Sequence, residues 1–263
     1  MPLTFAAMTP HPPILIPTIG NEQIENLANT KKAMELLEQE LYIAKPQIIF
    51  IISPHSGIFP NAFVVNANTH FVSSFEEFGD LATKKTWHGA PEIAAKMSHK
   101  AKLSHLPLQQ ISQERIDHGA SVALYYLTNH TPDVRVLPLG YSSLDQGAHL
   151  AFGELLKDII MDEERRVAVI ASGDLSHCLT TESPAGFRPA GKKFDETLIR
   201  HLTKKNVQGL IDLDQTLTKE AEECGYRSLL ILLGILKDMP FRFQKYSYEC
   251  PFGVGYLVGQ FIF

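Results

Sequence analysis

The amino-acid sequence predicts an α/β fold, a three-layer α/β/α sandwich with a mixed, mostly parallel central sheet. Two short segments, 48–52 and 167–171, are apolar at every position, which is typical of strands covered by helices on both faces. Segments with helical spacing lie between the strands, and this alternation is typical of parallel sheets whose crossovers are helices. Two closing segments alternate well enough to add antiparallel strands near the C-terminus.

The first half of the chain supplies three predicted strands and three predicted helices. An apolar run from Leu3 to Met8 predicts a buried strand, and it stops at the proline-rich loop 9–13. Apolar residues then recur at helical spacing through 21–44, with Asn21 as the predicted N-cap. The other predicted elements of this half are strands at 48–52 and 62–67 and helices at 91–103 and 119–127.

The second half continues the alternation of strands and helices. A strand at 134–139 precedes a helix that begins near Asp145 and ends at Met161. The apolar strand 167–171 follows and leads into a loop with the sequence SGDLSH. The remaining predicted elements are helices at 192–202 and 222–236 and closing strands at 241–248 and 253–263.

Length and composition limit the class of protein. The chain has 263 residues and is 44% hydrophobic, which is enough for one large core, and no Gly/Ser- or Pro-rich spacer divides it. We therefore expect a single domain over 1–263. The net charge of -5, with both signs interspersed, argues against nucleic-acid binding, which needs a basic patch.

Targeting signals are also missing from the sequence. A membrane-spanning helix needs a run of about 18 apolar residues, and none occurs; the N-terminus has no basic region of the kind that begins a secretory signal. Three cysteines do not make an even disulfide framework and fit a reducing compartment. The expected location is the cytoplasm.

Histidines follow three of the predicted buried strands. His11, His55 and His177 come a few residues after the strands that end near Met8, Ile52 and Ala171. Ligands of open α/β sheets bind outside the carboxyl ends of the strands, so we expect these side chains to converge on one crevice. Prolines stiffen the loops that hold His11 and His55, and imidazole is a common ligand of zinc, iron, copper and nickel.

Two carboxylates next to histidines allow either a structural or a functional interpretation. Asp117 precedes His118 at a predicted helix start, where it serves as an N-cap. Asp174 lies three residues before His177 and either caps a turn or fixes the tautomer of a neighbouring histidine.

The third protein ligand of such a site is left open by the local sequence. Two histidines and one carboxylate form the facial triad of non-haem Fe(II) oxygenases. Glu222 and Glu223 are candidates, although acidic residues are favoured at a helix start for electrostatic reasons alone. Cys224 is a candidate ligand for a soft metal and is otherwise a small buried hydrophobic residue.

Four short motifs in this order resemble the class III extradiol ring-cleavage dioxygenases, the LigB-like catalytic subunits, and the related Memo-like proteins. The similarity runs from His11 to the closing segment 253–258, and the motifs are TPHPP at 9–13, SPHSG at 53–57, DHGA at 117–120 and SGDLSH at 172–177.

The resemblance implies a three-layer α/β fold and one non-haem Fe(II) ion held by two histidines and a glutamate. By motif position, His11 and His55 would be the histidine ligands. His177 would be the acid/base, oriented by Asp174, and His118 would help to bind substrate or oxygen. For the third ligand we choose Glu223, which supplies the carboxylate that a dioxygenase needs, with Glu222 and Cys224 as rivals. Cys224 is a rival because Memo-like proteins carry a Cys-Gly pair here whose cysteine sits at the metal.

The implied activity is ring cleavage of a catechol-type aromatic with O2. The alternatives are a Memo-like metal-binding, redox or peptide-binding protein without dioxygenase activity, and a zinc hydrolase that uses the same histidines. Arg188, Lys192 and Lys193 are either solvated surface residues or partners of a substrate carboxylate. We expect a homo-oligomer, and some of these dioxygenases also have a small partner subunit.

Overall fold

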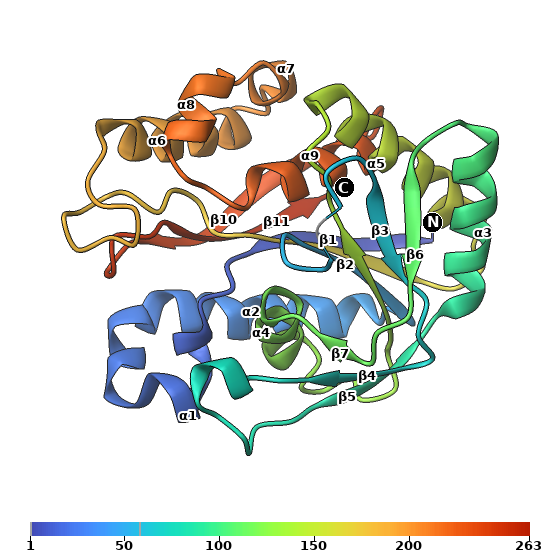
Figure 1. Cartoon of the computed structure of the whole chain (residues 1–263), viewed down its shortest axis with the longest axis horizontal. Coiled ribbons are helices and arrows are strands. Elements are labelled where there is room, and N and C mark those ends of the chain that lie inside the picture. The colour runs from blue at the N-terminus through green and yellow to red at the C-terminus, as the bar shows by residue number, and fades with distance from the viewer. Residues whose placement is uncertain (1, 58) are drawn as a thin grey trace.

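The computed structural model describes residues 2–57 and 59–263, which form one mixed sheet between two layers of helices (Figure 1). The predicted fold class is confirmed. The described strands follow the order β10-β11-β1-β9-β2-β8-β5-β4-β7, and β3 pairs with β8 and β6. Their bounds are β1 Leu3–Thr9, β2 Ile48–Ser53, β3 Phe63–Asn66, β4 His70–Ser73, β5 Thr86–Gly89, β6 Leu108–Ile111, β7 Arg115–Ile116, β8 Arg135–Gly140, β9 Val167–Ser172, β10 Arg242–Glu249 and β11 Tyr256–Ile262.

The centre of the sheet is parallel, and its flanks contain antiparallel pairs. β1 pairs with β9, β9 with β2, and β2 with β8, all in parallel. β11 adds to the free edge of β1 in the antiparallel sense, and β10 continues the hairpin. The carboxyl ends of β1, β9 and β2 therefore lie side by side at one edge of the sheet.

Helices cover both faces of this central region. One layer contains α3 Pro91–Leu103, α5 Gln146–Met161, α6 Pro189–Thr203, α7 Val207–Ile211, α8 Gln215–Glu220 and α9 Tyr226–Ile235. The other contains α2 Ala28–Ala44 and α4 His118–Leu127, together with the short segments η1 Pro13–Leu15, α1 Pro17–Gly20 and η2 Asn21–Leu27; η3 Glu76–Phe78 lies after β4.

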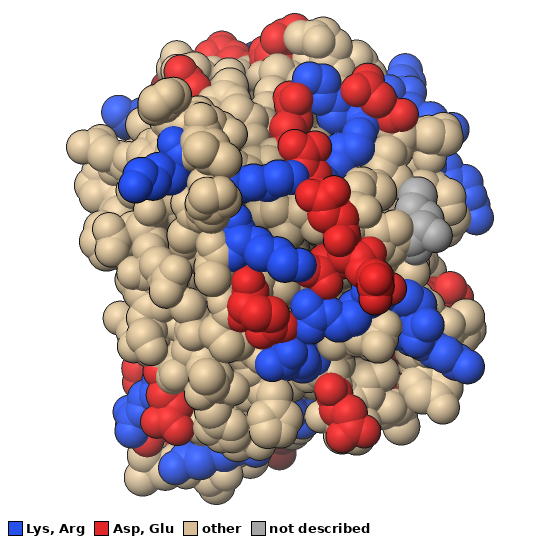
Figure 2. Space-filling model, turned by 90° about the vertical axis from the view of Figure 1, so that its right-hand side faces the viewer, with Lys and Arg blue, Asp and Glu red and all other residues tan. Residues whose placement is uncertain are grey.

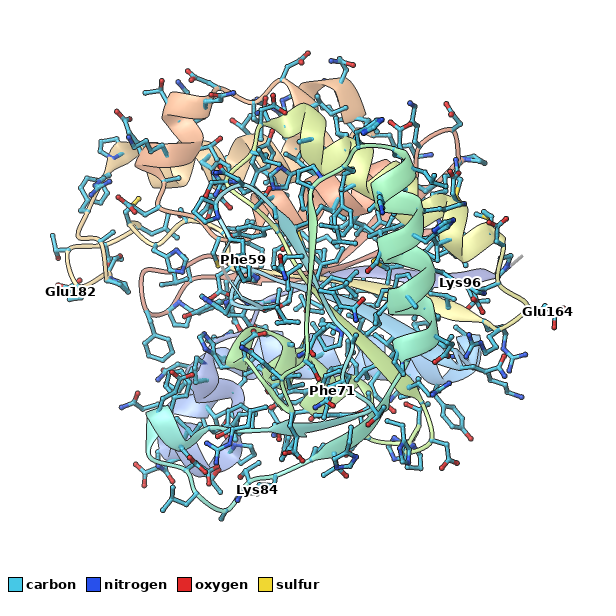
Figure 3. The ribbon with its side chains drawn as sticks, turned by 45° about the vertical axis from the view of Figure 1, so that its right-hand side comes forward. Phe59, Phe71, Lys84, Lys96, Glu164 and Glu182 are labelled. Atoms are coloured by element: carbon cyan, nitrogen blue, oxygen red, sulfur yellow. The ribbon has the colours of Figure 1, made fainter. Side chains whose placement is uncertain are left out.

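Two-sided burial explains the uniformly apolar strands. In β2, Phe50 and Ile52 pack into the layer of α5 and α9, whereas Ile49 and Ile51 pack into the layer of α2 and α4. Successive side chains of a strand point to opposite faces, so both faces require apolar residues. Figure 3 shows the difference between buried and surface side chains: Phe71 is buried, whereas Lys84 and Glu182 project outward.

Glycines let α5 and α9 pack closely in the upper layer. A Cβ built on Gly234 would lie 2.3 Å from the carbonyl oxygen of Leu150 and 2.9 Å from the Cα of Gly153. Contacts this short exclude any side chain, so the two helices approach each other through their backbones. This contact fixes α9, whose start carries part of the site described below.

Two predicted helices begin later than the sequence indicates. The segment 21–27 is a 3-10 helix, and Asn21 has a φ of 46° instead of capping α2. α9 begins at Tyr226 because Glu222 has a φ of 53°, which a helix does not allow. Residues 222–225 are therefore a turn, and the direction of each side chain there differs from that in a helix.

Charges of both signs are mixed on the surface. Figure 2 shows Lys and Arg interleaved with Asp and Glu on one face. Ion pairs on α3 and next to it include Lys96 with Glu163 at 2.7 Å and Arg135 with Glu92 at 2.8 Å. Within the described part of the chain, the helices are too short or too polar to cross a membrane.

Candidate metal centre

The three neighbouring strands β1, β9 and β2 deliver the candidate site residues to one place. His11 comes two residues after β1, His55 two after β2, and Asp174 two after β9. His118 is the first residue of α4, which packs beneath the same strand ends. Sequence order separates these residues widely, but parallel neighbours end at the same edge of a sheet.

Three imidazole rings meet at this edge. The Nε2 atoms of His11 and His55 are 3.3 Å apart, and the ring centroids of His55 and His118 are 4.3 Å apart. One nitrogen of each of the three rings lies within 4.8 Å of a nitrogen of the others. Three histidines at this spacing are able to hold one metal ion.

A second group of donors shares His11. The Sγ atom of Cys224 is 3.7 Å from Nε2 of His11, and a carboxylate oxygen of Asp174 completes a triad within 4.8 Å. Asp174 also accepts a hydrogen bond from the backbone N–H of His11 at 2.8 Å. His11 thus belongs to both groups of donors.

The structure does not bring Glu222 or Glu223 into either group of donors among the residues it describes. Glu223 turns its carboxylate to the start of α9, where it accepts a hydrogen bond from the N–H of Tyr226 at 2.6 Å. Glu222 is exposed and forms an ion pair with Arg188 at 2.8 Å. The turn at 222–225 thus presents Cys224 to the histidines and both glutamates elsewhere, so the choice of Glu223 as the third ligand is not supported by its placement.

His177 lies at the side of this cluster. Its Nδ1 atom contacts the carbonyl oxygen of Glu222, and a carbonyl accepts a hydrogen bond only from a protonated nitrogen. In the neutral imidazole Nε2 is then the acceptor nitrogen, and it lies 4.0 Å from a carboxylate oxygen of Asp174. The side chain is 24% exposed, so it is accessible from the crevice.

Burial sets the protonation of the donors. Desolvation, followed by repulsion from the neighbouring histidines, holds the pKa of His11 well below its usual value, and desolvation also lowers the pKa of His55. Both are neutral at neutral pH, which is the form that binds metals. Desolvation raises the pKa of Asp174 to about 6 and the pKa of the Cys224 thiol well above its usual value.

Hydroxyl groups that the sequence did not single out hold the ligand loops in place. Ser172 donates a hydrogen bond to the carbonyl of Gly119 at 2.7 Å and lies 3.0 Å from Nδ1 of His11. Asp117 caps α4 through the N–H of Ala120 and also accepts hydrogen bonds from the hydroxyls of Ser53 and Ser56. Ser53 and Ser56 lie in the motif SPHSG and Ser172 lies in the motif SGDLSH. Membership of these motifs is the sequence signal by which the serines could have been found.

The donor set fits a divalent first-row transition metal. Neutral imidazoles, a thiol and a carboxylate suit iron, zinc and copper, and each donor is held by strand ends whose loops are tied together. His11 would hold the ion together with either His55 and His118 or Asp174 and Cys224. The residues therefore form a candidate His/Asp/Cys metal site.

Comparison with known proteins identifies the family. The profile of the family described as "Catalytic LigB subunit of aromatic ring-opening dioxygenase" matches residues 5–259. The chain belongs to the LigB family. MEMO1 family proteins are also similar to this LigB-family chain: that of Methanosarcina mazei is 23% identical over 231 residues, 82% of each chain, and that of Archaeoglobus fulgidus is 20% identical, covering 84% of this chain and 87% of that protein.

Two further relatives extend the comparison. Protein CA_C1420 of Clostridium acetobutylicum is 29% identical over 97% of this LigB-family chain, which spans only 57% of the length of that relative. The crystal structure of protein JW3007 from Escherichia coli K12 has a TM-score of 0.66 at 18% identity, covering 98% of this chain and 99% of that one. This similarity shows that the fold is shared.

Proposed function

We propose that the chain is a non-haem Fe(II)-dependent dioxygenase that cleaves a catechol-type ring beside the two hydroxylated carbons, with both atoms of O2 entering the product. The observation that carries this proposal is the convergence of two donor groups on His11 at the carboxyl edge of the sheet, one with His55 and His118 and one with Asp174 and Cys224, in a chain of the LigB family. Fe(II) supplies the redox chemistry that O2 needs to react with an aromatic ring.

The third protein ligand in this proposal is Cys224 instead of Glu223. Its Sγ atom is 3.7 Å from Nε2 of His11, and the N–H of Asp174 donates to it at 3.2 Å. Burial keeps the isolated thiol protonated, but a bound cation favours the thiolate because the opposite charges attract. Metal binding should therefore release one proton from Cys224.

His177 acts as the base and acid of the reaction. The carbonyl of Glu222 holds the Nδ1 proton, so in the neutral imidazole Nε2 is the nitrogen that takes a proton from a substrate hydroxyl. Asp174, 4.0 Å away, stabilises the imidazolium that results. The same imidazolium then returns its proton when the ring opens.

Metal binding tests the ligand assignment. Protein purified without oxygen should bind Fe(II) in a one-to-one ratio, and Cys224→Ala and His11→Ala should lose it. Glu223→Gln is the matched control, since it changes the neighbouring residue, whose carboxylate faces Tyr226. Iron lost from Glu223→Gln but kept by Cys224→Ala would reverse the assignment.

Oxygen consumption tests the reaction itself. The iron-loaded protein should consume O2 with at least one member of a panel of catechols and produce the ring-opened product. His177→Ala should keep its iron and lose roughly 10²–10⁴-fold in turnover, the usual contribution of an acid/base group. Unchanged turnover in this variant would refute the role of His177.

The second candidate function is a Memo-like metal-binding protein without ring cleavage. The placement of Cys224 at the histidines, with Glu223 turned away, favours it, and the names of several relatives agree. This function predicts tight metal binding that depends on Cys224 and no oxygen consumption with any catechol. Zinc without iron in protein isolated anaerobically would instead favour a hydrolase.

A further inference from the structure

The segment between β4 and β5 contacts the candidate metal centre at His118. It contains η3 and lies beside α1 (Figure 1). A carboxylate oxygen of Glu77 lies 3.2 Å from Nδ1 of His118, and the ring of Phe78 meets the same imidazole edge-on, with centroids 5.1 Å apart. The ring of His118 lies in turn 4.3 Å from that of His55. Two consecutive residues of η3 are therefore joined to the histidine cluster through one imidazole.

Buried contacts on both sides of η3 fix its position. Phe75, which precedes it, is fully buried. Asp80, which follows it, is also buried, and its carboxylate accepts hydrogen bonds from the hydroxyl of Thr18 in α1 and from the N–H groups of Ala82 and Thr83, the last two at 2.9 and 3.0 Å. A side chain presented by a segment that is already ordered loses less conformational entropy on forming a contact than one on a free loop.

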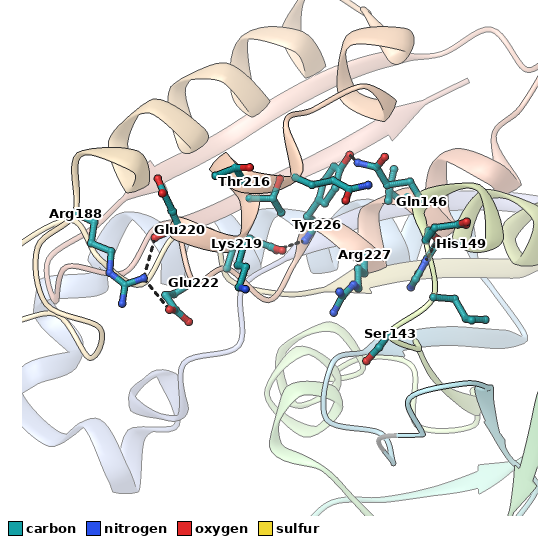
Figure 4. A pocket seen from close by; sticks show the side chains of 16 residues that line it. Ser143, Gln146, His149, Arg188, Thr216, Lys219, Glu220, Glu222, Tyr226 and Arg227 are labelled. Atoms are coloured by element: carbon teal, nitrogen blue, oxygen red, sulfur yellow. Dashed lines mark hydrogen bonds and ion pairs between the residues drawn. The ribbon is translucent and has the colours of Figure 1, made fainter.

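The charged partner of Glu77 differs from those of two other glutamates near the site. Glu76 forms an ion pair with Arg115 at 2.9 Å, which ties η3 to β7. Glu222 forms an ion pair with Arg188 at the turn before α9 (Figure 4). Among the ion pairs of the described residues, that of Glu77 is formed with the imidazole at the start of α4. Its carboxylate is therefore available to act on a histidine of the site.

We propose that Glu77 is a positioning residue of the metal centre, which holds His118 in its orientation against His55 and in the tautomer protonated at Nδ1. An ionised carboxylate has no proton to donate, so Nδ1 of His118 is the donor in their contact. In the neutral imidazole Nε2 then has the free lone pair, and a histidine binds a metal ion through such a nitrogen. A carboxylate that accepts the other ring N–H fixes both the tautomer and the direction of the ring.

This inference deepens the proposed function and rests on it for the chemistry that the metal centre performs. His118 forms one donor group with His11 and His55, so the tautomer of His118 decides whether this group has three usable nitrogens. The contact between Glu77 and His118 needs no metal ion. The tautomer is therefore measurable independently of iron and of ring cleavage.

¹⁵N NMR of the histidine rings in metal-depleted protein tests the tautomer, at about pH 8, where an ordinary histidine is neutral. The signals missing from His118→Ala identify this residue, and in the native chain they should be those of the Nδ1–H form. Glu77→Ala should reduce the ratio of the Nδ1–H to the Nε2–H form by about three- to tenfold, because a charge-assisted hydrogen bond that is partly exposed contributes at the lower end of its range. Glu77 is 63% exposed, so the substitution should leave the fold intact.

Two further variants separate the carboxylate of Glu77 from the segment that carries it. Glu77→Gln retains an oxygen that accepts a hydrogen bond and should keep part of the preference for Nδ1–H. Glu76→Ala is the matched control, since it removes the neighbouring carboxylate, whose partner is Arg115, and should leave the His118 signals unchanged. An Nε2–H form in the native chain, native signals in Glu77→Ala, or equal changes in Glu76→Ala and Glu77→Ala would overturn the proposal.

Co(II) affinity in a double-mutant cycle tests the consequence for the metal centre. Glu77→Ala should weaken Co(II) binding by about tenfold, the lower end of the effect of a residue that orients a metal-site histidine. The same substitution should have little further effect in a chain that carries His118→Ala, because Glu77 acts through that imidazole. Native affinity in Glu77→Ala, or an equal loss with and without His118, would overturn the proposal.

The two proposals fail in different ways. A His118 tautomer and a Co(II) affinity that depend on Glu77, without oxygen consumption on any catechol, would overturn ring cleavage and leave the positioning role standing. Oxygen consumption by a chain whose His118 signals and Co(II) affinity are the same with and without Glu77→Ala would overturn the positioning role alone.

Discussion

Replacing Ser172 by alanine should weaken metal binding although Ser172 is not a ligand. The hydroxyl of Ser172 has one proton, and the carbonyl of Gly119 receives it at 2.7 Å. The contact of 3.0 Å with His11 therefore requires Nδ1 of His11 to be the donor. Nε2 of His11 is left unprotonated and faces His55 and Cys224, so the serine selects the tautomer that binds a metal.

The magnitude follows from these two hydrogen bonds. Removing the partner that orients a ligating histidine costs about 10–100-fold in metal affinity, or roughly 1.4–2.8 kcal/mol. The carbonyl of Gly119 also loses this second donor beside its helical partner, and one such hydrogen bond contributes about 0.5–1.5 kcal/mol of folding free energy. Each kcal/mol of lost folding free energy lowers the melting temperature of a chain of this size by about 2–4 °C.

Chelator competition with Co(II) or Zn(II) measures the affinity, and ¹⁵N NMR of the histidine rings reports the tautomer of His11 in the metal-free protein. Ser228→Ala is the control, because Ser228 is buried in α9 and its hydroxyl has no hydrogen-bond partner among the described residues. Unchanged affinity in Ser172→Ala, or an equal loss in Ser228→Ala, would refute the reasoning.

Three further substitutions test the packing and electrostatics described above. Gly234→Ala should destabilise the fold by about 1–3 kcal/mol, measured by chemical unfolding, because its Cβ would lie 2.3 Å from the Leu150 carbonyl oxygen; unchanged stability would contradict the close α5–α9 contact. Gly119→Ala should reduce metal affinity in the same competition assay, since its Cβ would approach Cδ2 of His55 to 3.1 Å; full affinity would mean that the loop shifts freely. Burial raises the pKa of Asp195 from 3.8 to about 6. Ionisation of this carboxyl in the folded chain therefore lowers the free energy of unfolding by up to about 3 kcal/mol above that pH, and has no effect below the pKa of the unfolded chain. Asp195→Asn should therefore gain stability relative to the native chain at about pH 8 but not at about pH 4, and an equal effect at both values would exclude ionisation as the cause.

Most of the fold was predictable because the composition of the central strands indicates that both of their faces are buried. A run such as IIFII at 48–52 is apolar on both faces, and only a strand covered by helices on both sides requires that. The strands β4 to β7 are short, partly exposed and mixed with polar residues, so no periodicity marked them. β6 pairs with β3, and the pairing of the others depends on contacts with β8 and with one another.

The grouping of the histidines in the candidate site was predictable, whereas the direction of the side chains at 222–224 was not. His11 and His55 follow strand ends, and the direction of a strand end is set by the sheet. The third position lies in a turn, where one residue with positive φ, Glu222, reverses which side chains face inward. A helix over 222–236 would have presented these side chains differently, so the choice between Glu223 and Cys224 depended on where α9 begins.

The position of β1 in the sheet determines when this strand is able to pair during synthesis of the chain. The strand that delivers His11 is synthesised early, but its two neighbours are β9 and β11, from residues 167–172 and 256–262. Until both have been synthesised, β1 has unpaired edges and the thiol of Cys224 has no fixed partner. Metal capture should thus coincide with completion of the sheet, and a nascent chain stalled before β11 should expose β1 to chaperones or to pairing with other chains.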